Sequence, residues 1–452
     1  MRIIEIAVVL LFSIIGILYL PNAIIRRNCV SLRFLTFVIV VQNIVCVMAN
    51  DTFGSTIGQF IILYKEFILY GGVCTYLILT KKGKISKKVL PFVAVIGVLG
   101  GYLFVGTAEI YTKLICFRQI MTPIILVLYG STIQISMNEL ASFTKFIMNL
   151  GVFQVIFGVM ERFILGDSFW LALHIEKYME SKGFSQWIYS NGLPGNYYSA
   201  DLYSIIGTTF RRLVGITTDP LMTGHFLAFC IVILLFVKVY NSNLKQNIVL
   251  ILMTAAVVLT FSKGALLIIA LAYWYKMWRK NRGYAILLLA IMLLVIGIII
   301  KRNIFYTVQI HVEGLTSSFS IRSLLGNGLG SAGNYAALYG TSSTTSGESY
   351  IGMLLAQTGI LGLSTFVYAF AKWSGRIIRI NKTSLSYSVF AYVIAVLVEA
   401  LVSESAVNYV GSGIAFVILG ILIHPMEQVY LETQSSESTH LPEHSEIAEF
   451  IP

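Results

Sequence analysis

The chain has 452 residues, of which 57% are hydrophobic and 12% are charged, and its formal net charge is +11. No water-soluble domain buries that much apolar surface, so the composition excludes one and predicts an all-α polytopic membrane protein. A β-barrel is disfavoured because barrel strands alternate apolar and polar residues, whereas the apolar runs here are continuous. The basic excess indicates no nucleic-acid partner, because inward-facing basic loops of a membrane protein account for it.

In chain order, we expect about 13 transmembrane helices, because a helix that crosses a bilayer needs about 20 mostly apolar residues. They are predicted at 3–20, 34–50, 56–80, 89–106, 115–131, 146–164, 214–237, 247–261, 264–278, 284–300, 350–371, 384–402 and 409–425. Lysines are densest at 81–88, which places that link in the cytoplasm. Alternation then predicts an outside N-terminus and a cytoplasmic C-terminus.

The links divide the chain into six parts. They are the N-terminal transmembrane helices (1–164), a first outer loop (165–213), central helices (214–300), a second outer loop (301–349), C-terminal helices (350–425) and a cytoplasmic tail (426–452). The tail is acidic and poor in apolar residues, which predicts disorder. The two long extracytoplasmic loops are where we expect ligand binding. Within the first, FWLALHIEKYMESKGF predicts a helical piece along the membrane surface.

The segment RRLVGITTDPLMTGHF leads from the first outer loop into an apolar helix. Asp219 followed by Pro220 is typical of a helix start, with the aspartate as N-cap and the proline in the first turn. A helix N-terminus with Arg211 and Arg212 beside it favours a phosphate or pyrophosphate group. The alternative is that these arginines contact only the phosphates of outer-leaflet lipids.

Several other polar residues interrupt the apolar segments. Lys263, in the hairpin LTFSKGALL, either has a role outside the membrane or snorkels to its surface. His225 is either a polar packing residue or a secondary candidate proton acceptor. The other charges are interpreted as structural ion pairs, at Lys65-Glu66 and Glu161-Arg162, or as residues that line a cavity, at Glu399 and Glu404. The five cysteines have no metal-ligand spacing, so no metal is expected.

The second outer loop ends in a Gly- and Ser-rich stretch. Arg322 precedes the turn NGLGS at 327–331, whose glycines Gly328 and Gly330 favour a tight turn with amides that face an anion. Glu348 stands just ahead of the next apolar helix. It is either the N-cap of that helix or a general base whose carboxylate accepts a proton.

Taken in order, these segments resemble the O-antigen polymerase and O-antigen ligase family of bacterial polysaccharide assembly. The matching residues are Arg212–Gly215 with Asp219-Pro220 and Gly224, then Leu259–Gly264, Gly326–Ser331 and Glu348–Gly362. The resemblance covers about residues 205–370. Ligases carry histidine where this chain has Glu348, and Ser349 replaces the usual asparagine, so the resemblance favours a polymerase.

The resemblance implies a GT-C-like bundle and a metal-independent glycosyltransferase without a cofactor, located in the bacterial cytoplasmic membrane. Its substrates would be oligosaccharide units on undecaprenyl pyrophosphate, joined into an O-antigen, capsule or exopolysaccharide. Pyrophosphate would be held by Arg211, Arg212, Arg322 and Lys263, and Glu348 would be the base, with His225 second. A chain-length regulator and a flippase of the same pathway would be partners. The alternatives are ligase-type transfer of a finished glycan, or a glycan-lipid transporter.

Overall fold

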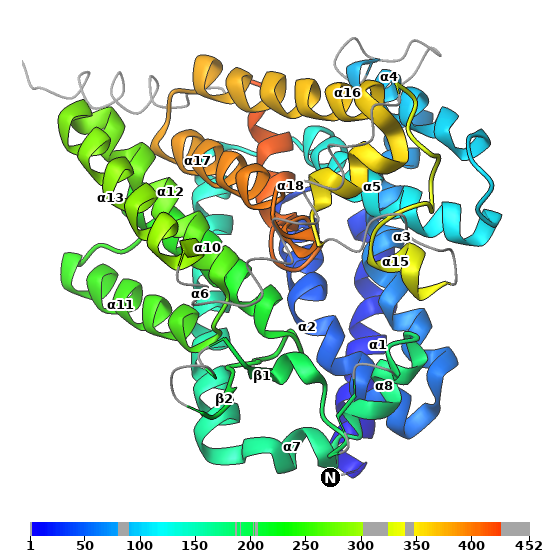
Figure 1. The fold of residues 1–452 in the computed structure, drawn as a ribbon. Helices are drawn as coiled ribbons and strands as arrows, with labels where there is room; N and C mark the ends of the chain where they lie inside the picture. Colours follow the sequence, from blue (N-terminus) through cyan, green and yellow to red (C-terminus); the bar gives the residue numbers. More distant parts are fainter. Residues whose placement is uncertain are drawn as a thin grey trace, which may run out of the picture.

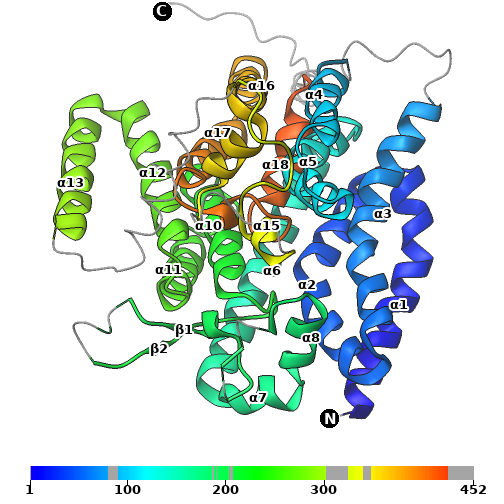
Figure 2. The same ribbon diagram turned by 45° about the vertical axis from the view of Figure 1, so that its right-hand side comes forward.

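The computed structural model describes residues 2–79, 90–185, 188–189, 191–201, 203, 207–301, 324–339 and 348–425, with the backbone alone at 295–301. These residues form an almost entirely helical protein (Figure 1). Three long helices, α1 (Arg2–Ile25), α2 (Cys29–Phe53) and α3 (Ser55–Leu79), pack against one another and stand on one side of the molecule (Figure 2).

The rest of the first half contains α4 (Leu90–Gly101), η1 (Tyr102–Phe104), α5 (Ile110–Ser131), α6 (Met137–Met160) and η2 (Glu161–Leu165). The first outer loop contains α7 (Gly166–Ala172), α8 (Ile175–Ser181), η4 (Gly195–Tyr197), β1 (Tyr198–Ser199) and β2 (Phe210–Arg211), and the two strands pair antiparallel. The predicted surface helix of this loop is therefore two short helices. They are separated at His174, whose φ of 49° no α-helix accommodates.

The second half contains α10 (Pro220–Phe236), α11 (Asn243–Leu259), α12 (Lys263–Lys280) and α13 (Arg282–Lys301). After it come α15 (Asn334–Leu338), α16 (Tyr350–Ile380), α17 (Ser384–Glu399), η5 (Glu404–Ala406) and α18 (Gly413–Leu422). Helix α10 is buried along most of its length and packs against α6, α11, α12 and α17. It is therefore the central helix of this half.

A helix occupies each of the 13 predicted segments, but the predicted number of spans is not confirmed. Within the part of the chain that the structure describes, six helical segments are long and apolar enough to cross a bilayer: Arg2–Ile25, Cys29–Phe53, Ser55–Ile78, Ile110–Ser131, Met137–Ala172 and Tyr350–Ile380. Six further apolar segments of the described residues have 10 to 17 residues, and one of them, Arg282–Leu294, is the part of α13 whose side chains are described. Helix α18, with 10 residues, extends about 15 Å at the usual rise of a helix, half of a hydrocarbon core of about 30 Å.

Helices α5 and α18 cross in close contact at two glycines. A Cβ atom on Gly130 would lie 2.0 Å from the carbonyl oxygen of Val417, and one on Gly420 would lie 2.1 Å from that of Val127. Only glycine fits at either position, so the two backbones approach as small residues allow in membrane helices. This crossing fixes α5, which carries two polar residues of the candidate site, relative to the C-terminal helices.

Different helices and loops lie at the two ends of the helical bundle. The N-terminus lies at the same end as α7, α8 and the β1–β2 ribbon, whereas α4 and the second half of α16 lie toward the other end (Figure 1). The charge pattern predicts the same grouping, with the N-terminus and the first outer loop on one side of the membrane. The basic cluster at 81–88, on which that orientation depends, lies outside the described residues.

Candidate functional site

The loop that carries the two predicted arginines is built around Glu161, whose side chain is fully buried. One carboxylate oxygen of Glu161 accepts hydrogen bonds from Trp170 Nε1 at 2.6 Å and from the guanidinium of Arg211. The other accepts the backbone N–H of Val214 at 3.2 Å. Arg211 Nε also contacts Asp167 at 2.6 Å. Two carboxylates therefore neutralise Arg211, and the predicted structural ion pair at Glu161 uses Arg211 instead of its neighbour in sequence.

Arg212 joins two of the motifs. Its Nε donates to the carbonyl of Thr260 at 2.7 Å, and its Nη2 donates to that of Phe261 at 3.2 Å. Its Nη1 donates to the carbonyl of Asn196 at 3.3 Å. The side chain is buried, with 8% exposure. Within the described part of the chain, it forms no ion pair with a carboxylate. Arg212 therefore connects the outer loop to the turn between α11 and α12.

Helix α10 begins as the sequence predicts. Asp219 is its N-cap, accepting the amides of Leu221 at 2.7 Å and Met222 at 3.1 Å, and Pro220 is its first residue. The second carboxylate oxygen of Asp219 accepts the side-chain amide of Asn196 at 3.1 Å. Because Asp219 already occupies these amides, the N-terminus of α10 is not the open anion site that the sequence suggested.

Two further predicted residues hold neighbouring parts of the chain. Gly215 has a φ of 71°, and a Cβ atom there would lie 2.1 Å from Gln154 Nε2, so the turn requires glycine. Lys263 Nζ pairs with Asp201 at 2.7 Å. Ser262 caps α12 by accepting the amide of Ala265 at 3.3 Å. Lys263 therefore contacts an acidic residue of the first outer loop, and snorkelling alone does not describe it.

His225 and Glu399 form a buried pair between α10 and α17, with side chains about 1% exposed. Nε2 of His225 lies 2.6 Å and 2.8 Å from the two carboxylate oxygens. Its Nδ1 lies 2.6 Å from the carbonyl oxygen of Leu221, which only accepts, so Nδ1 carries a hydrogen. One further proton lies between Nε2 and the carboxylate, and the pair is neutral overall.

The glycine of the S-K-G hairpin makes room for this pair. A Cβ atom on Gly264 would lie 1.7 Å from Glu399 Oε1. We therefore expect Gly264→Ala to displace the carboxylate and to destabilise the protein by about 1–3 kcal/mol, as overpacking does. Thermal unfolding of the purified protein in detergent measures this loss.

Gly375→Ala is the matched control for Gly264→Ala. A Cβ atom on Gly375, inside α16, would meet no atom within 4 Å. Alanine is also the better helix former. We therefore expect an unchanged or slightly raised melting temperature for this variant. Equal melting temperatures of the two variants would contradict close packing at Gly264.

The predicted glycine turn lies against a break in α16. Helix α16 contains one residue with non-helical dihedrals, Gly359, at φ 64° and ψ −167°. The turn fills the break: Asn327 N donates to the carbonyl of Ala356 at 2.9 Å, and Gly328 N donates to that of Gln357 at 3.0 Å. These amides therefore bind protein carbonyls and not an anion, contrary to the prediction, and the predicted span 350–371 is not one continuous helix.

Two other predicted residues of this stretch are Gly330 and Arg322. Gly330 has a φ of 82°, and its amide lies 3.4 Å from Gln357 Oε1, so it belongs to the same turn. Arg322 lies outside the described residues, and its predicted role in binding pyrophosphate stays a prediction.

Ser349, and not Glu348, caps α16, since its hydroxyl accepts the amide of Gly352 at 2.8 Å. The capping alternative for Glu348 is therefore wrong. Glu348 interacts electrostatically with Glu404. Burial raises the pKa of Glu404, and the negative charge of Glu348 raises it further, although hydrogen bonds from Gln119 and Asn334 oppose the shift. A nearby negative charge disfavours the ionised form of a carboxyl group, so Glu348 acts on Glu404 in the same direction as burial.

Glu404 also accepts hydrogen bonds from α5 and α15. One of its oxygens accepts Gln119 Nε2 at 2.8 Å, and the other accepts the backbone N–H of Asn334 at 2.9 Å. Next to Gln119, Arg118 pairs with Glu66 of α3 at 3.3 Å. No motif in the sequence marks Arg118 or Gln119. The signal is weak: two polar residues that interrupt the otherwise apolar predicted span 115–131.

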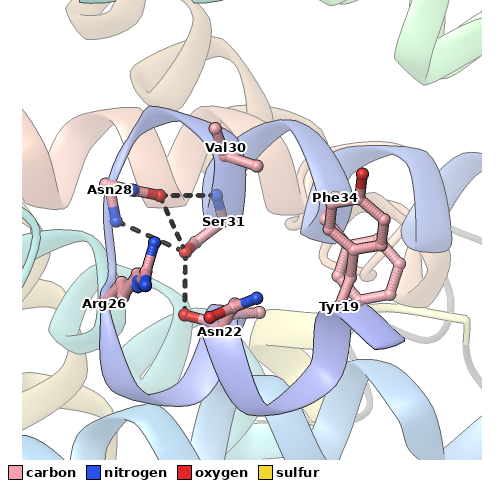
Figure 3. Close-up of a pocket in the computed structure, with 8 residues that line it drawn as sticks. Tyr19, Asn22, Arg26, Asn28, Val30, Ser31 and Phe34 are labelled. Atoms are coloured by element: carbon pink, nitrogen blue, oxygen red, sulfur yellow. Dashed lines mark hydrogen bonds between the residues drawn. The ribbon is translucent and has the colours of Figure 1, made fainter. Parts of the chain in front are cut away.

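A hollow elsewhere in the molecule contains none of the predicted residues. It lies at the turn between α1 and α2 (Figure 3), and its lining includes Tyr19, Asn22, Arg26, Asn28, Ser31 and Phe34. Its polar atoms serve the start of α2, because the side chain of Asn28 accepts the amide of Ser31 at 3.1 Å. Among the described residues, no three His, Cys, Asp or Glu side chains are placed to hold a metal ion.

The chain matches no protein-family model, and no curated protein with a significantly similar sequence was found. The likeness to the O-antigen polymerase and ligase family therefore rests on the four short motifs.

Proposed function

We propose that this chain is a membrane glycosyltransferase that polymerises oligosaccharide units linked to undecaprenyl pyrophosphate. The product would be a surface polysaccharide made on the outer face of a bacterial cytoplasmic membrane. A GT-C-like arrangement of 13 spans, with the N-terminus outside, belongs to the same proposal. The observation that carries it is an acidic residue, Glu348, that directly precedes a helix capped by its neighbour and interacts with a second, buried carboxylate.

The reaction needs a proton acceptor and a stabilised leaving group. A hydroxyl at the non-reducing end of one lipid-linked unit attacks the anomeric carbon of the growing chain. A new glycosidic bond forms, and the bond from that carbon to pyrophosphate oxygen breaks. The hydroxyl proton passes to Glu348, and the pyrophosphate leaves on its own polyprenyl chain. No electron acceptor or metal is required for this balance.

The contacts divide the other predicted residues by role. Arg211 and Lys263 already pair with acidic residues, so their first role is to position the loop. Arg212 has no ion pair within the described residues, but its guanidinium already donates to three main-chain carbonyls, so its predicted contact with pyrophosphate stays a prediction. His225 is buried and is bonded through both ring nitrogens, which suits a structural pair better than a base.

Glu348→Gln tests the proposal, because glutamine keeps the size of the side chain and cannot accept the proton. In cells that carry this variant at normal membrane levels, we expect the polysaccharide to fall from long polymer to single repeat units on a gel. Glu180→Gln, at an exposed position in α8, is the matched control and should leave the polymer unchanged.

Other outcomes of the Glu348→Gln experiment point elsewhere. Long polymer that is made but not attached to its acceptor would favour ligase-type transfer. An unchanged ladder would remove Glu348 from the reaction. Glycan-lipid that crosses the bilayer of vesicles containing only the purified protein would support a transporter and contradict the glycosyltransferase.

A further inference from the structure

A groove lies where α6 begins, α10 ends and α17 begins, and it contains none of the residues of the candidate site. We call it the three-helix groove. Its volume is about 420 Å³, within the range of roughly 300–1,000 Å³ that is usual for ligand pockets. Half of its lining is apolar, including Leu140, Val237 and Leu385, and two lysines, Lys145 and Lys238, also line it. The groove therefore combines an apolar lining with positive charge.

Hydrogen bonds at the helix ends hold the walls of the three-helix groove. Ser136 caps α6 and Thr383 caps α17, each by accepting a backbone amide, at 3.2 Å and 3.1 Å. At the end of α10, Gln246 Nε2 donates to the carbonyl of Val237 at 3.0 Å. Two helices thus begin at the groove and one ends there, so the helix dipoles together favour a negative charge in it.

The positive charge of the groove has no acidic partner among the described residues. Lys145 and Lys238 are exposed, and within this part of the chain neither forms an ion pair. A third cation, Arg33 of α2, donates to the lining hydroxyl of Ser142 at 2.7 Å. The carboxylate of Glu139 in α6 is already occupied, because it accepts the backbone N–H of the α6 cap at 2.8 Å. The lining therefore suits an acidic occupant that also has apolar side chains.

The end of α18 lies beside this groove. The side-chain amide of Asn381 donates to the carbonyl of Leu422 at 2.5 Å and to that of His424 at 3.3 Å. Asn381 stands two positions before Thr383, which caps α17 and lines the groove. These bonds fix the end of α18 at the turn between α16 and α17. Residues 426–452 therefore follow from the edge of the groove.

The sequence that follows α18 has the composition that the lining suits. Residues 426–452 contain six glutamates and no lysine or arginine. The segment EQVYLE at 427–432 places the apolar residues Val429, Tyr430 and Leu431 between two glutamates. Four residues of extended chain span up to about 14 Å, so this segment reaches the near edge of the groove from the end of α18. Its two carboxylates match the two lysines of the lining.

We propose that the acidic segment 427–432 docks in the three-helix groove, with its glutamates toward Lys145 and Lys238 and its apolar side chains against the apolar lining. A tethered segment has an effective concentration of roughly millimolar order, so weak contacts suffice to fill the groove. The composition of the tail predicts disorder when it is unbound, and segments of this kind can order on binding. No substrate takes part, so the proposal is independent of the proposed function.

The experiment treats the purified full-length protein, in neutral detergent, with a carbodiimide that joins a lysine to a carboxylate only where the two are in contact. We expect mass spectrometry to find Lys145 or Lys238 joined to a glutamate of the segment 427–432. Lys245 is the matched control, an exposed lysine that follows Lys238 in the same link and does not line the groove. It should give about tenfold less product, because the docked segment is held away from it. Equal coupling at Lys245, or none at either groove lysine, would overturn the proposal.

A variant provides a second readout. Glutamyl endopeptidase cleaves after Glu427 and Glu432, and docking protects both bonds. In the double variant Lys145→Gln with Lys238→Gln, we expect cleavage there to be roughly three- to tenfold faster than in the natural protein, because two exposed ion pairs are lost. Lys245→Gln should leave the rate unchanged. A double variant that is cleaved at the natural rate contradicts docking. If it fails to fold, the coupling test on the natural protein still decides.

Two other occupants are outcomes of the coupling test. If a few equivalents of phosphatidylglycerol abolish the coupling, the groove binds an acidic lipid head group and the tail is not its occupant. A mixture of isotope-labelled and unlabelled protein tests a second copy of the chain. Products that join a labelled peptide to an unlabelled one would overturn docking within one chain. Products confined to single copies and unaffected by the lipid support it.

Discussion

Arg212→Ala is expected to destabilise the folded protein by about 3 kcal/mol or more, because three main-chain carbonyls, one buried and two partly buried, lose their donor at about 1–3 kcal/mol each. The carbonyls belong to Asn196, Thr260 and Phe261, from two segments that Arg212 holds together. The melting temperature of the purified protein in detergent measures the loss. Polysaccharide length should fall as well, since the loop beside the proposed site loses its attachment.

Arg212→Lys separates charge from geometry. Lysine keeps the positive charge, but its single ammonium group cannot reach three carbonyls that point at different edges of a planar guanidinium. We therefore expect a melting temperature close to that of Arg212→Ala. Arg379→Ala, at an exposed position in α16, is the control and should melt as the natural protein does. A stable Arg212→Ala protein that makes no polymer would instead show that the arginine acts on the substrate.

Glu399→Ala is expected to cost about 3–5 kcal/mol, as for other buried pairs that lose one partner. In the natural protein, His225 Nε2 lies 2.6 Å from a carboxylate oxygen of Glu399. In the variant, this buried nitrogen would have no hydrogen-bond partner. His225→Ala should cost a similar amount. The double variant should lose clearly less than the sum, because the first substitution already removes the interaction.

Glu399→Gln refines this prediction. The amide of glutamine donates to a neutral imidazole nitrogen, so this variant should be much milder than Glu399→Ala. Additive effects of the two alanine substitutions would contradict a coupled pair, and so would a Glu399→Gln protein as unstable as Glu399→Ala. Thermal unfolding in detergent again provides the measurement, with circular dichroism to confirm helix content.

The resemblance led us to expect pyrophosphate at the arginine motif, whereas the contacts divide the work differently. Arg211 and Lys263 serve to hold the outer loop, and Arg212 bonds to main-chain carbonyls.

The sequence by itself determined the features that depend on local chemistry. Long apolar runs predicted helices at all 13 segments, because each run must bury its own backbone hydrogen bonds in lipid. Asp219 and Pro220 predicted the start of α10, because a cap and a first-turn proline act within a few residues.

Only the tertiary structure decided which polar groups meet. Glu161 pairs with Arg211, which lies 50 residues further along the sequence, and His225 pairs with Glu399, which lies 174 residues further along. The break at Gly359 exists because a distant turn supplies donors for the carbonyls that the helix leaves open. Such partners depend on how helices pack, and the energy of a buried pair comes from its surroundings more than from the residues themselves.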